Sequence, residues 1–185
     1  MQIKLLLLDF DGTLADTRCA NTLAYIAALA EEGYEISEEL YLQKYFGMRC
    51  PEFLRDIGFT NAEDIDRIRR RKIEIYPSYF NTVKLNEPLW EFAKDFRAKG
   101  GKVWVVSTGQ RDNIINAMRH LGIEESFDGI LTSEAVEHSK PAPDCFLKAM
   151  EIEGVTPAET LIFEDSEIGL EAARRSGASY FKVTL

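Results

Sequence analysis

The sequence predicts an α/β protein with a central parallel sheet and a helical insert after the first strand. A nearly continuous apolar run, Ile3 to Leu8, suits a strand that is buried on both faces. After residue 86, strand patterns alternate with helix patterns, which favours parallel strands joined by right-handed crossovers. From Thr17 to about residue 80 the spacing of apolar residues is helical throughout. We therefore assign residues 1–16 and 86–185 to an α/β core domain and residues 17–85 to a helical domain.

Composition and charge narrow the class of protein. In a chain of 185 residues, 45% are hydrophobic and 29% are charged, which is typical of a soluble globular protein. The formal net charge of −9 argues against nucleic acid or an anionic membrane as a partner, so a phosphorylated substrate would need a metal ion or a local cationic pocket. The three cysteines are far apart, and the apolar run that Asp9 interrupts is too short for a signal core or a membrane span. We expect a cytoplasmic protein with reduced thiols, either a monomer or a weak dimer.

The end of the first strand carries two carboxylates, Asp9 and Asp11. A buried carboxylate is costly unless it is paired or bound to a metal, and Gly12 allows the chain to turn away at once. In open parallel α/β sheets, ligands bind at the carboxyl ends of the strands. The alternative is an acidic turn that caps the next helix, since acidic residues are common in turns.

Four helices are predicted in the insert. The first has an apolar stripe and ends at Gly33; Ser37 begins the second, Pro51 the third and Asn61 the fourth. The stripe of the first helix is Leu23, Ile26, Ala27 and Ala30, and that of the fourth is Ile65, Ile68, Lys72, Ile75 and Tyr79. The fourth helix also carries a basic run, Arg67 and residues 69–72. We interpret this run as a solvated helix face rather than a site that attracts anions.

The second half of the chain reads as alternating helices and strands. Pro88 opens a helix whose apolar stripe is Leu89, Phe92, Ala93 and Phe96. Further helices are predicted at 112–120, 143–152 and 167–175, and strands at 102–106, 127–131, 161–163 and 180–183. We read Trp90 and Trp104 as core or interface residues, and His120 and His138 as structural.

Three of these segments end in residues that can carry chemistry. Ser107 and Thr108 follow a strand and precede Gly109, a pattern that suits a phosphate site but also an ordinary helix cap. Lys140 lies beside two prolines that stiffen its loop, although a lone lysine in such a turn is commonly a surface residue. Glu164 and Asp165 follow another buried strand. Two acidic pairs brought together would repel, and Mg²⁺, which prefers oxygen ligands, would relieve that repulsion.

The order of these motifs resembles the haloacid dehalogenase superfamily of phosphotransferases. The matching segments are Asp9-x-Asp11-Gly12-Thr13, Ser107 after a strand, Lys140 before Pro-x-Pro, and Glu164-Asp165-Ser166-x-x-Gly169. The insert resembles the cap of the beta-phosphoglucomutase and phosphoglycolate-phosphatase-like branch. This resemblance implies a Rossmann-like three-layer core, a helical cap domain, and a Mg²⁺-dependent phosphatase that acts on a small phosphorylated metabolite.

The resemblance also implies a role for each motif residue. Asp9 is the expected nucleophile that forms an aspartyl-phosphate, and Asp11 the acid that protonates the leaving group and then accepts a proton from water. Ser107, Thr108 and Lys140 are expected to bind the phosphoryl group. Asp165, the Asp9 side chain and the Asp11 carbonyl are expected to bind Mg²⁺, with Glu164 as a ligand through water or a supporting partner. Asp11 favours an oxygen leaving group, because a halide needs no proton.

Two departures separate this chain from the mutases of that branch. Asn21 stands where beta-phosphoglucomutases have a histidine, and Arg49 lies one place away from the arginine of their cap loop. We therefore prefer a phosphatase, with a sugar-phosphate mutase as the alternative and a catalytically idle protein that binds a phosphorylated ligand as a third reading. Thr17, Asn21 and Arg49 are the candidate substrate residues. The sequence stops soon after the last predicted strand, where many relatives continue, so we expect a shorter sheet edge.

Overall fold

The computed structural model describes residues 2–185, which fold as two compact units. One unit extends to Asp16 and resumes at Lys84, and the other is Thr17–Val83. No helix in the described chain combines the length and the apolar character needed to span a bilayer.

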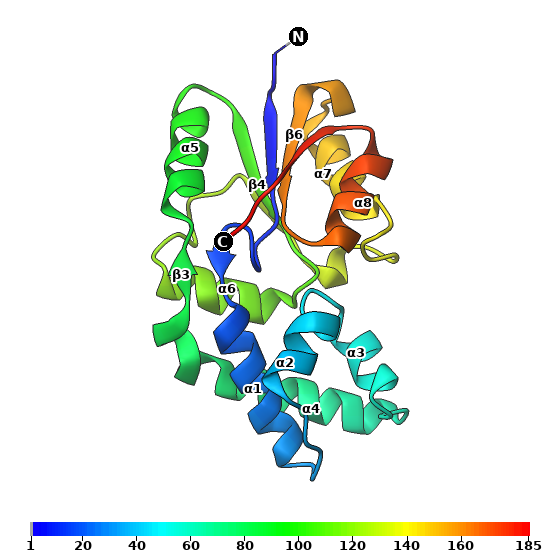
Figure 1. Cartoon of the computed structure of the whole chain (residues 1–185). Helices are drawn as coiled ribbons and strands as arrows, with labels where there is room; N and C mark the ends of the chain where they lie inside the picture. The colour runs from blue at the N-terminus through cyan, green and yellow to red at the C-terminus, as the bar shows by residue number, and fades with distance from the viewer. Residues whose placement is uncertain (1) are drawn as a thin grey trace. The chain divides into compact units, whose positions relative to one another are not determined.

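The first unit is an α/β structure, which confirms the predicted fold class (Figure 1). Its five-stranded sheet has the order β5-β4-β1-β6-β7, and every neighbouring pair is parallel. The strands are β1 (Leu5–Leu8), β4 (Lys102–Val106), β5 (Gly129–Leu131), β6 (Thr160–Glu164) and β7 (Ser179–Lys182). The helices are α5 (Glu87–Ala98), α6 (Arg111–His120), α7 (Asp144–Glu153) and α8 (Glu167–Ser176), with short 3₁₀ turns at Ser133–Ala135 and Pro157–Glu159.

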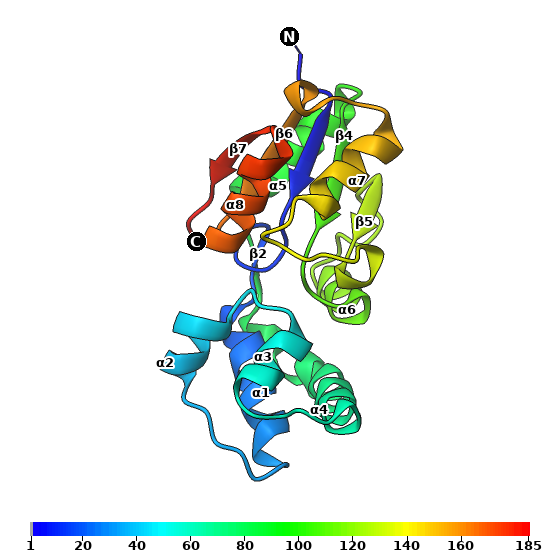
Figure 2. The same ribbon diagram turned by 90° about the vertical axis from the view of Figure 1, so that its right-hand side faces the viewer.

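Helices cover both faces of this sheet, as a three-layer core requires. Alternate residues of β1 point to opposite faces, so Leu5 and Leu7 pack with Trp104 and Ile162 against one layer. That layer contributes Phe146 and Met150 from α7 and Ala172 and Ala173 from α8. Figure 2 shows α7 and α8 in front of the sheet and α5 behind it. All four β1 leucines are fully buried, and each contributes about 1.5–3 kcal/mol through burial.

The register of the sheet brings the predicted motifs to one rim. Leu8 lies level with Val105 of β4 and with Phe163 of β6. The residues that follow these positions, Asp9, Val106 and Glu164, therefore lie side by side at the carboxyl ends of the three central strands.

A short two-stranded ribbon lies in the α/β unit where the chain leaves for the helical unit and where it returns. β2 (Ala15–Asp16) pairs antiparallel with β3 (Lys84–Leu85), with Asp16 opposite Lys84. The sequence analysis assigns residues 84 and 85 to the helical insert, whereas in the structure they belong to the α/β unit. Strands of two residues are too short to give a periodic pattern.

The second unit is entirely helical. It contains α1 (Arg18–Ala30), α2 (Glu38–Leu40), a π-helical turn (Tyr41–Tyr45), α3 (Cys50–Asp56), α4 (Ala62–Ile75) and a 3₁₀ segment (Tyr76–Thr82). Ser37 and Asn61 cap α2 and α4 as predicted: their side-chain oxygens accept hydrogen bonds from Leu40 N (3.2 Å) and Glu63 N (2.9 Å). Phe53 is the centre of its core, with its ring 4.7–5.5 Å from the rings of Tyr25, Tyr41 and Tyr45.

The apolar stripes predicted for two helices are partly wrong. In α1 the packed face is Tyr25, Ala28 and Leu29, with Ile26 at its edge, because Tyr25 and Leu29 belong to the cluster around Phe53. Leu23 and Ala27 are only half-buried, and Ala30 is exposed. In α5, Trp90 is buried while Phe92 is 46% exposed. Both helices have apolar residues around most of their circumference, so spacing alone does not select the face.

Candidate active site

Asp9 is fixed in place by the sheet itself. Its backbone N–H continues the ladder by donating to Phe163 O (3.0 Å), and its side chain is buried, with the residue 5% exposed. Gly12 then turns the chain with a φ of 93°, a conformation that other residues avoid. A Cβ at Gly12 would also overlap the Asp165 carboxylate. The turn after β1 therefore needs glycine both for its conformation and for its close approach to the second acidic pair.

Lys140 is a buried residue of this site, not a surface lysine. Its side chain is 1% exposed, and its ammonium donates to Asp9 Oδ1 (2.7 Å), Glu164 Oε1 (3.0 Å) and Val106 O (3.2 Å). These contacts link β1, β4 and β6. Burial alone would lower the pKa of the ammonium, but the Asp9 and Glu164 carboxylates beside it raise that pKa overall. Lys140 therefore stays charged and holds one oxygen of Asp9.

The second acidic pair is held by its own contacts. Glu164 is 1% exposed, and its Oε2 accepts a hydrogen bond from Ser166 N (3.0 Å). Gly169 in the first turn of α8 leaves room for this carboxylate, because a Cβ there would overlap it. Asp165 Oδ1 accepts a hydrogen bond from Thr13 Oγ1 (3.0 Å), which ties β6 to the turn after β1.

Asp9, Glu164 and Asp165 form a compact acidic cluster. One carboxylate oxygen from each lies within 4.8 Å of the others. Burial, partly offset by Lys140, raises the pKa of Asp9, and burial together with the Glu164 charge raises the pKa of Asp165 to about 6. The three carboxylates share a single neighbouring ammonium, that of Lys140, which contacts those of Asp9 and Glu164. This excess of negative charge, presented by oxygen atoms alone, fits a hard divalent cation such as Mg²⁺.

Asp11 and Ser107 lie on the same rim. Asp11 is half-buried, and its Oδ2 lies 3.5 Å from Ser107 Oγ, the limit of a hydrogen bond. Ser107 Oγ also accepts a hydrogen bond from Gly109 N (2.9 Å), and Ser107 N donates to Leu131 O (2.9 Å). Thr108 follows in the same loop and is half-buried. The turn after β1 and the loop after β4 therefore place a carboxyl group and a hydroxyl side by side.

The three candidate substrate residues lie in the helical unit. Asn21 Nδ2 donates to Thr17 Oγ1 (3.1 Å) and Tyr76 OH (3.3 Å), so two of the candidates are in contact. Arg49 is half-buried and precedes α3. All of these contacts lie within the helical unit.

Lys72 makes a polar contact that its place in the apolar stripe and in the basic run does not predict. The residue is 3% exposed, and its Nζ donates to Asn21 Oδ1 (2.7 Å) and lies 3.7 Å from the centre of the Tyr76 ring. The neighbouring Arg67 and Arg71 pair with Glu32 and Glu31 at the surface, as a solvated face predicts. The helical position of Lys72, in line with Ile65 and Ile68, was the signal that separated it from those arginines.

The family follows from a comparison with known proteins. The model of the haloacid dehalogenase-like hydrolase family matches residues 6–183. This chain is a haloacid dehalogenase-like hydrolase. The resemblance drawn from the four motifs is thereby confirmed.

Several relatives of this haloacid dehalogenase-like hydrolase are named as phosphatases. It is 31% identical over 185 residues to fructose-1-phosphate phosphatase YqaB of Escherichia coli, covering 97% of this chain and 96% of that protein. It is 27% identical to a phosphorylated carbohydrates phosphatase of Thermotoga maritima, covering 95% of this chain and 82% of the relative. Both similarities extend over nearly the whole hydrolase, including the helical unit.

Solved structures share its fold. CbbY from Rhodobacter sphaeroides, whose structure was solved with xylulose-(1,5)bisphosphate, matches with a TM-score of 0.90 at 24% identity, over 100% of this chain and 87% of that one. A beta-phosphoglucomutase from Clostridium difficile matches with a TM-score of 0.86 at 22% identity, over 100% and 86% of the two chains. These matches establish the fold of the hydrolase.

Proposed function

We propose that this hydrolase is a Mg²⁺-dependent phosphatase that cleaves a phosphate monoester of a small metabolite through an aspartyl-phosphate on Asp9. The observation that carries the proposal is the pairing of Asp9 with Lys140 inside a cluster of carboxylates at the carboxyl rim of the sheet. A buried aspartate that a fixed cation holds by one oxygen is a positioned nucleophile, and the charge of Lys140 partly offsets the rise in the pKa of Asp9 on burial. Enzymes accelerate phosphoryl transfer mainly by positioning the reacting groups and stabilising the charge on the phosphoryl oxygens, and this group of residues can do both.

The proposed reaction has two steps. Lys140 holds Asp9 Oδ1, so Oδ2 is the oxygen that attacks phosphorus. As that bond forms, the bond between phosphorus and the ester oxygen breaks, and Asp11 donates a proton to the departing oxygen. Asp11 then accepts a proton from a water molecule that attacks the phosphoryl group, which releases phosphate and restores the Asp9 carboxylate. Ser107, Thr108 and Lys140 donate hydrogen bonds to the phosphoryl oxygens meanwhile.

The acidic cluster fits the divalent cation that this proposal includes. Asp9, Asp165 and the Asp11 carbonyl would hold it, with Glu164 acting through water or in support. When bound, the ion supplies positive charge that offsets the carboxylates and the phosphate.

We propose a phosphorylated carbohydrate as the substrate class. Two of the relatives are named for this chemistry, the fructose-1-phosphate phosphatase and the phosphorylated carbohydrates phosphatase. Thr17, Asn21 and Arg49 stay as the candidate substrate contacts. Alanine substitution at each position, with KM and kcat measured separately, tests those contacts.

The test of the activity is phosphate release from a panel of phosphorylated metabolites, with and without Mg²⁺. We expect Asp9→Asn to lower the rate by roughly 10³-fold or more, as loss of a nucleophile does in other enzymes. Asp95→Asn is the matched control, because Asp95 is exposed in α5 and, among residues 2–185, its carboxylate pairs only with Lys99. Wild-type turnover in Asp9→Asn contradicts the mechanism. A product assay that separates free phosphate from an isomerised sugar phosphate distinguishes the mutase alternative.

A further inference from the structure

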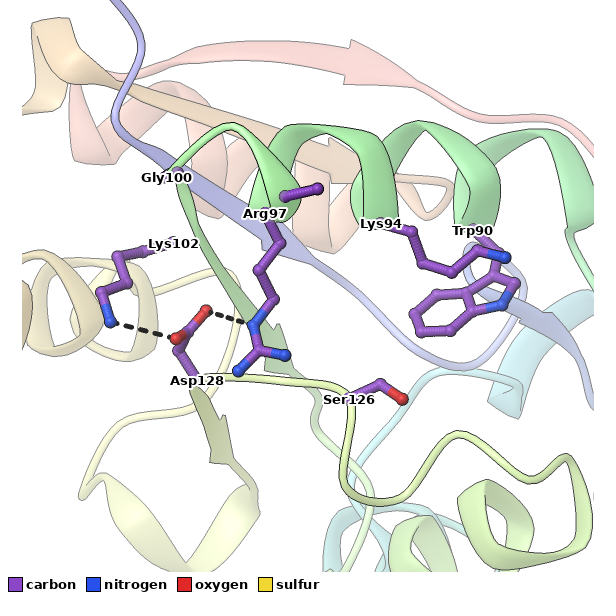
Figure 3. A pocket seen from close by; sticks show the side chains of 9 residues that line it. Trp90, Lys94, Arg97, Gly100, Lys102, Ser126 and Asp128 are labelled. Atoms are coloured by element: carbon purple, nitrogen blue, oxygen red, sulfur yellow. Dashed lines mark hydrogen bonds and ion pairs between the residues drawn. The ribbon is translucent and has the colours of Figure 1, made fainter.

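A pocket lies in the α/β unit, and none of the acidic-rim residues lines it. It has a volume of about 560 Å³, within the range of small-molecule sites, and Figure 3 shows its lining. Trp90, Lys94 and Arg97 come from one face of α5, while Lys102 and Asp128 stand at the amino ends of β4 and β5. The residues of the proposed catalytic site instead follow the carboxyl ends of strands. The pocket is thus distinct from that site.

The pocket wall carries an excess of positive charge in an acidic protein. Lys94, Arg97 and Lys102 line it together with a single carboxylate, Asp128, whereas the whole chain has a net charge of −9. Lys94 also pairs with Glu91 (2.7 Å), which is not among the lining residues. The local excess persists when Glu91 is counted, because the three cations Lys94, Arg97 and Lys102 then face two carboxylates, Asp128 and Glu91. Lys94 also keeps two further N–H donors.

The one carboxylate of the wall is already satisfied. Asp128 Oδ2 accepts hydrogen bonds from Arg97 Nε (3.1 Å) and from Val103 N (3.0 Å), and Oδ1 accepts one from Lys102 Nζ (3.0 Å). Burial opposes ionisation of Asp128, but the bonds from Val103, Arg97 and Lys102 outweigh it and lower the pKa. Asp128 therefore acts as a fixed counter-ion that orients the two cations, and three of its roughly four acceptor sites are taken up.

The polar groups of the pocket wall that have no bond to the residues that the structure describes are hydrogen-bond donors. Within residues 2–185, Arg97 uses only its Nε, so both terminal nitrogens of its guanidinium stay available. Figure 3 shows this guanidinium between Asp128 and Ser126. The Ser126 hydroxyl and the Trp90 indole N–H likewise have no hydrogen-bond partner in the described chain, although Trp90 is only 9% exposed. The Trp90 indole nitrogen is not one of the fully buried polar atoms of the described residues that lack a partner, so its N–H reaches the pocket surface. A molecule in the pocket can therefore accept a hydrogen bond from it.

We propose that this pocket binds a small phosphorylated anion at a second, non-catalytic site. A phosphate dianion is an acceptor suited to the donors that the wall leaves over, and the planar Arg97 fork matches its oxygens. The space beside Trp90 accommodates the organic part of a phosphate ester. This site does not depend on the activity proposed above.

The two tryptophans of the chain provide an internal readout. Each gives one indole N–H signal in a ¹H–¹⁵N spectrum: Trp90 lines the pocket, while Trp104 Nε1 donates to Glu153 Oε1 (2.7 Å). Trp90→Phe assigns the signals. We expect millimolar inorganic phosphate to shift the Trp90 signal in a saturable way and to leave Trp104 in place. Sodium chloride at equal ionic strength serves as the blank and sulfate as a test for a general oxyanion site.

Variants test whether the wall residues bind the anion. Arg97→Gln should weaken binding roughly tenfold, as loss of charge-assisted hydrogen bonds does, and Lys94→Gln should weaken it several-fold. Arg119→Gln removes an equal charge from an exposed arginine that pairs with Glu124, and should change affinity less than about twofold. If Arg97→Gln unfolds, Lys94→Gln alone decides.

A second arm distinguishes the source of the phosphate. Asp9→Asn protein without Mg²⁺ is titrated with a hexose phosphate, so that the probe is not consumed. Tighter binding than inorganic phosphate assigns the site to an organic phosphate, and equal binding assigns it to free phosphate. An unmoved Trp90 signal with both probes overturns the proposal, as does an equal effect of Arg97→Gln and Arg119→Gln.

Discussion

Replacement of Gly169 by alanine has two opposite effects on stability: it favours the helix, and it crowds the Glu164 side chain. Gly169 lies in the first turn of α8, and a Cβ there overlaps the buried Glu164 carboxylate, which accepts a hydrogen bond from Lys140. Helix propensity favours the change, since alanine stabilises a helix by about 1 kcal/mol relative to glycine. Glu164 must move to make room for the Cβ, and breaking its buried ion pair with Lys140 costs about 3–5 kcal/mol. We therefore expect Gly169→Ala to lower the free energy of unfolding by roughly 2–4 kcal/mol.

Urea unfolding of a double-mutant cycle tests this reasoning. Glu164→Asp shortens the side chain by one methylene and relieves the overlap, so Gly169→Ala should cost less in the Glu164→Asp background than in the wild type. Ile168→Ala, in the same turn of α8, controls for general effects on the helix and should have a small cost. A Gly169→Ala protein as stable as the wild type, or an equal cost in both backgrounds, refutes the argument that Glu164 fills this space.

Three further substitutions test other parts of the structure. Lys140→Met should destabilise the protein by about 3–5 kcal/mol in urea unfolding, since it leaves buried carboxylates unpaired, whereas Lys148→Met, at an exposed position, should cost little. Asn21→Leu should cost about 1–3 kcal/mol by removing an acceptor from the buried Lys72 ammonium, and Lys72→Met in the same chain should recover part of that cost; strictly additive costs would contradict the coupling. The pKa of Asp128 is lowered on folding, so its carboxylate stabilises the protein above its unfolded pKa of 3.8, and this contribution is lost as the pH falls through the folded pKa. Asp128→Asn should therefore cost more stability at neutral pH than in acid, and an equal cost at both would contradict the assignment.

The sequence predicts the parts of the site that are marked by charged residues directly after apolar strands. Asp9 and Asp165 follow apolar strands, and parallel strands bring their carboxyl ends to one rim, so their convergence follows from the pattern. Lys140 was ambiguous by itself, because a lysine in a proline-rich loop is a surface residue unless the fold buries it. Its position in the order of the motifs, rather than its own neighbours in sequence, indicated its place.

Other features depend on packing that the sequence pattern does not express. The buried face of α1 is set by the contacts of Tyr25 with the ring of Phe53, which is distant in sequence. Lys72 is buried beside Asn21 and Tyr76, which contact its ammonium. The sequence around it looks like that of an ordinary basic helix, so this tertiary contact is not visible in the pattern. The anion pocket likewise combines α5 with the amino ends of β4 and β5, which no local motif marks.

The measurement closest to the central claim is chemical trapping on Asp9. The enzyme is mixed with a phosphorylated substrate and Mg²⁺, quenched with hydroxylamine, which converts an acyl-phosphate to a hydroxamate, and the peptide that contains Asp9 is analysed by mass spectrometry. We expect the hydroxamate on Asp9 and its loss when Mg²⁺ is removed. Hydroxamate on another carboxylate, or wild-type turnover by Asp9→Asn, would contradict the proposed mechanism.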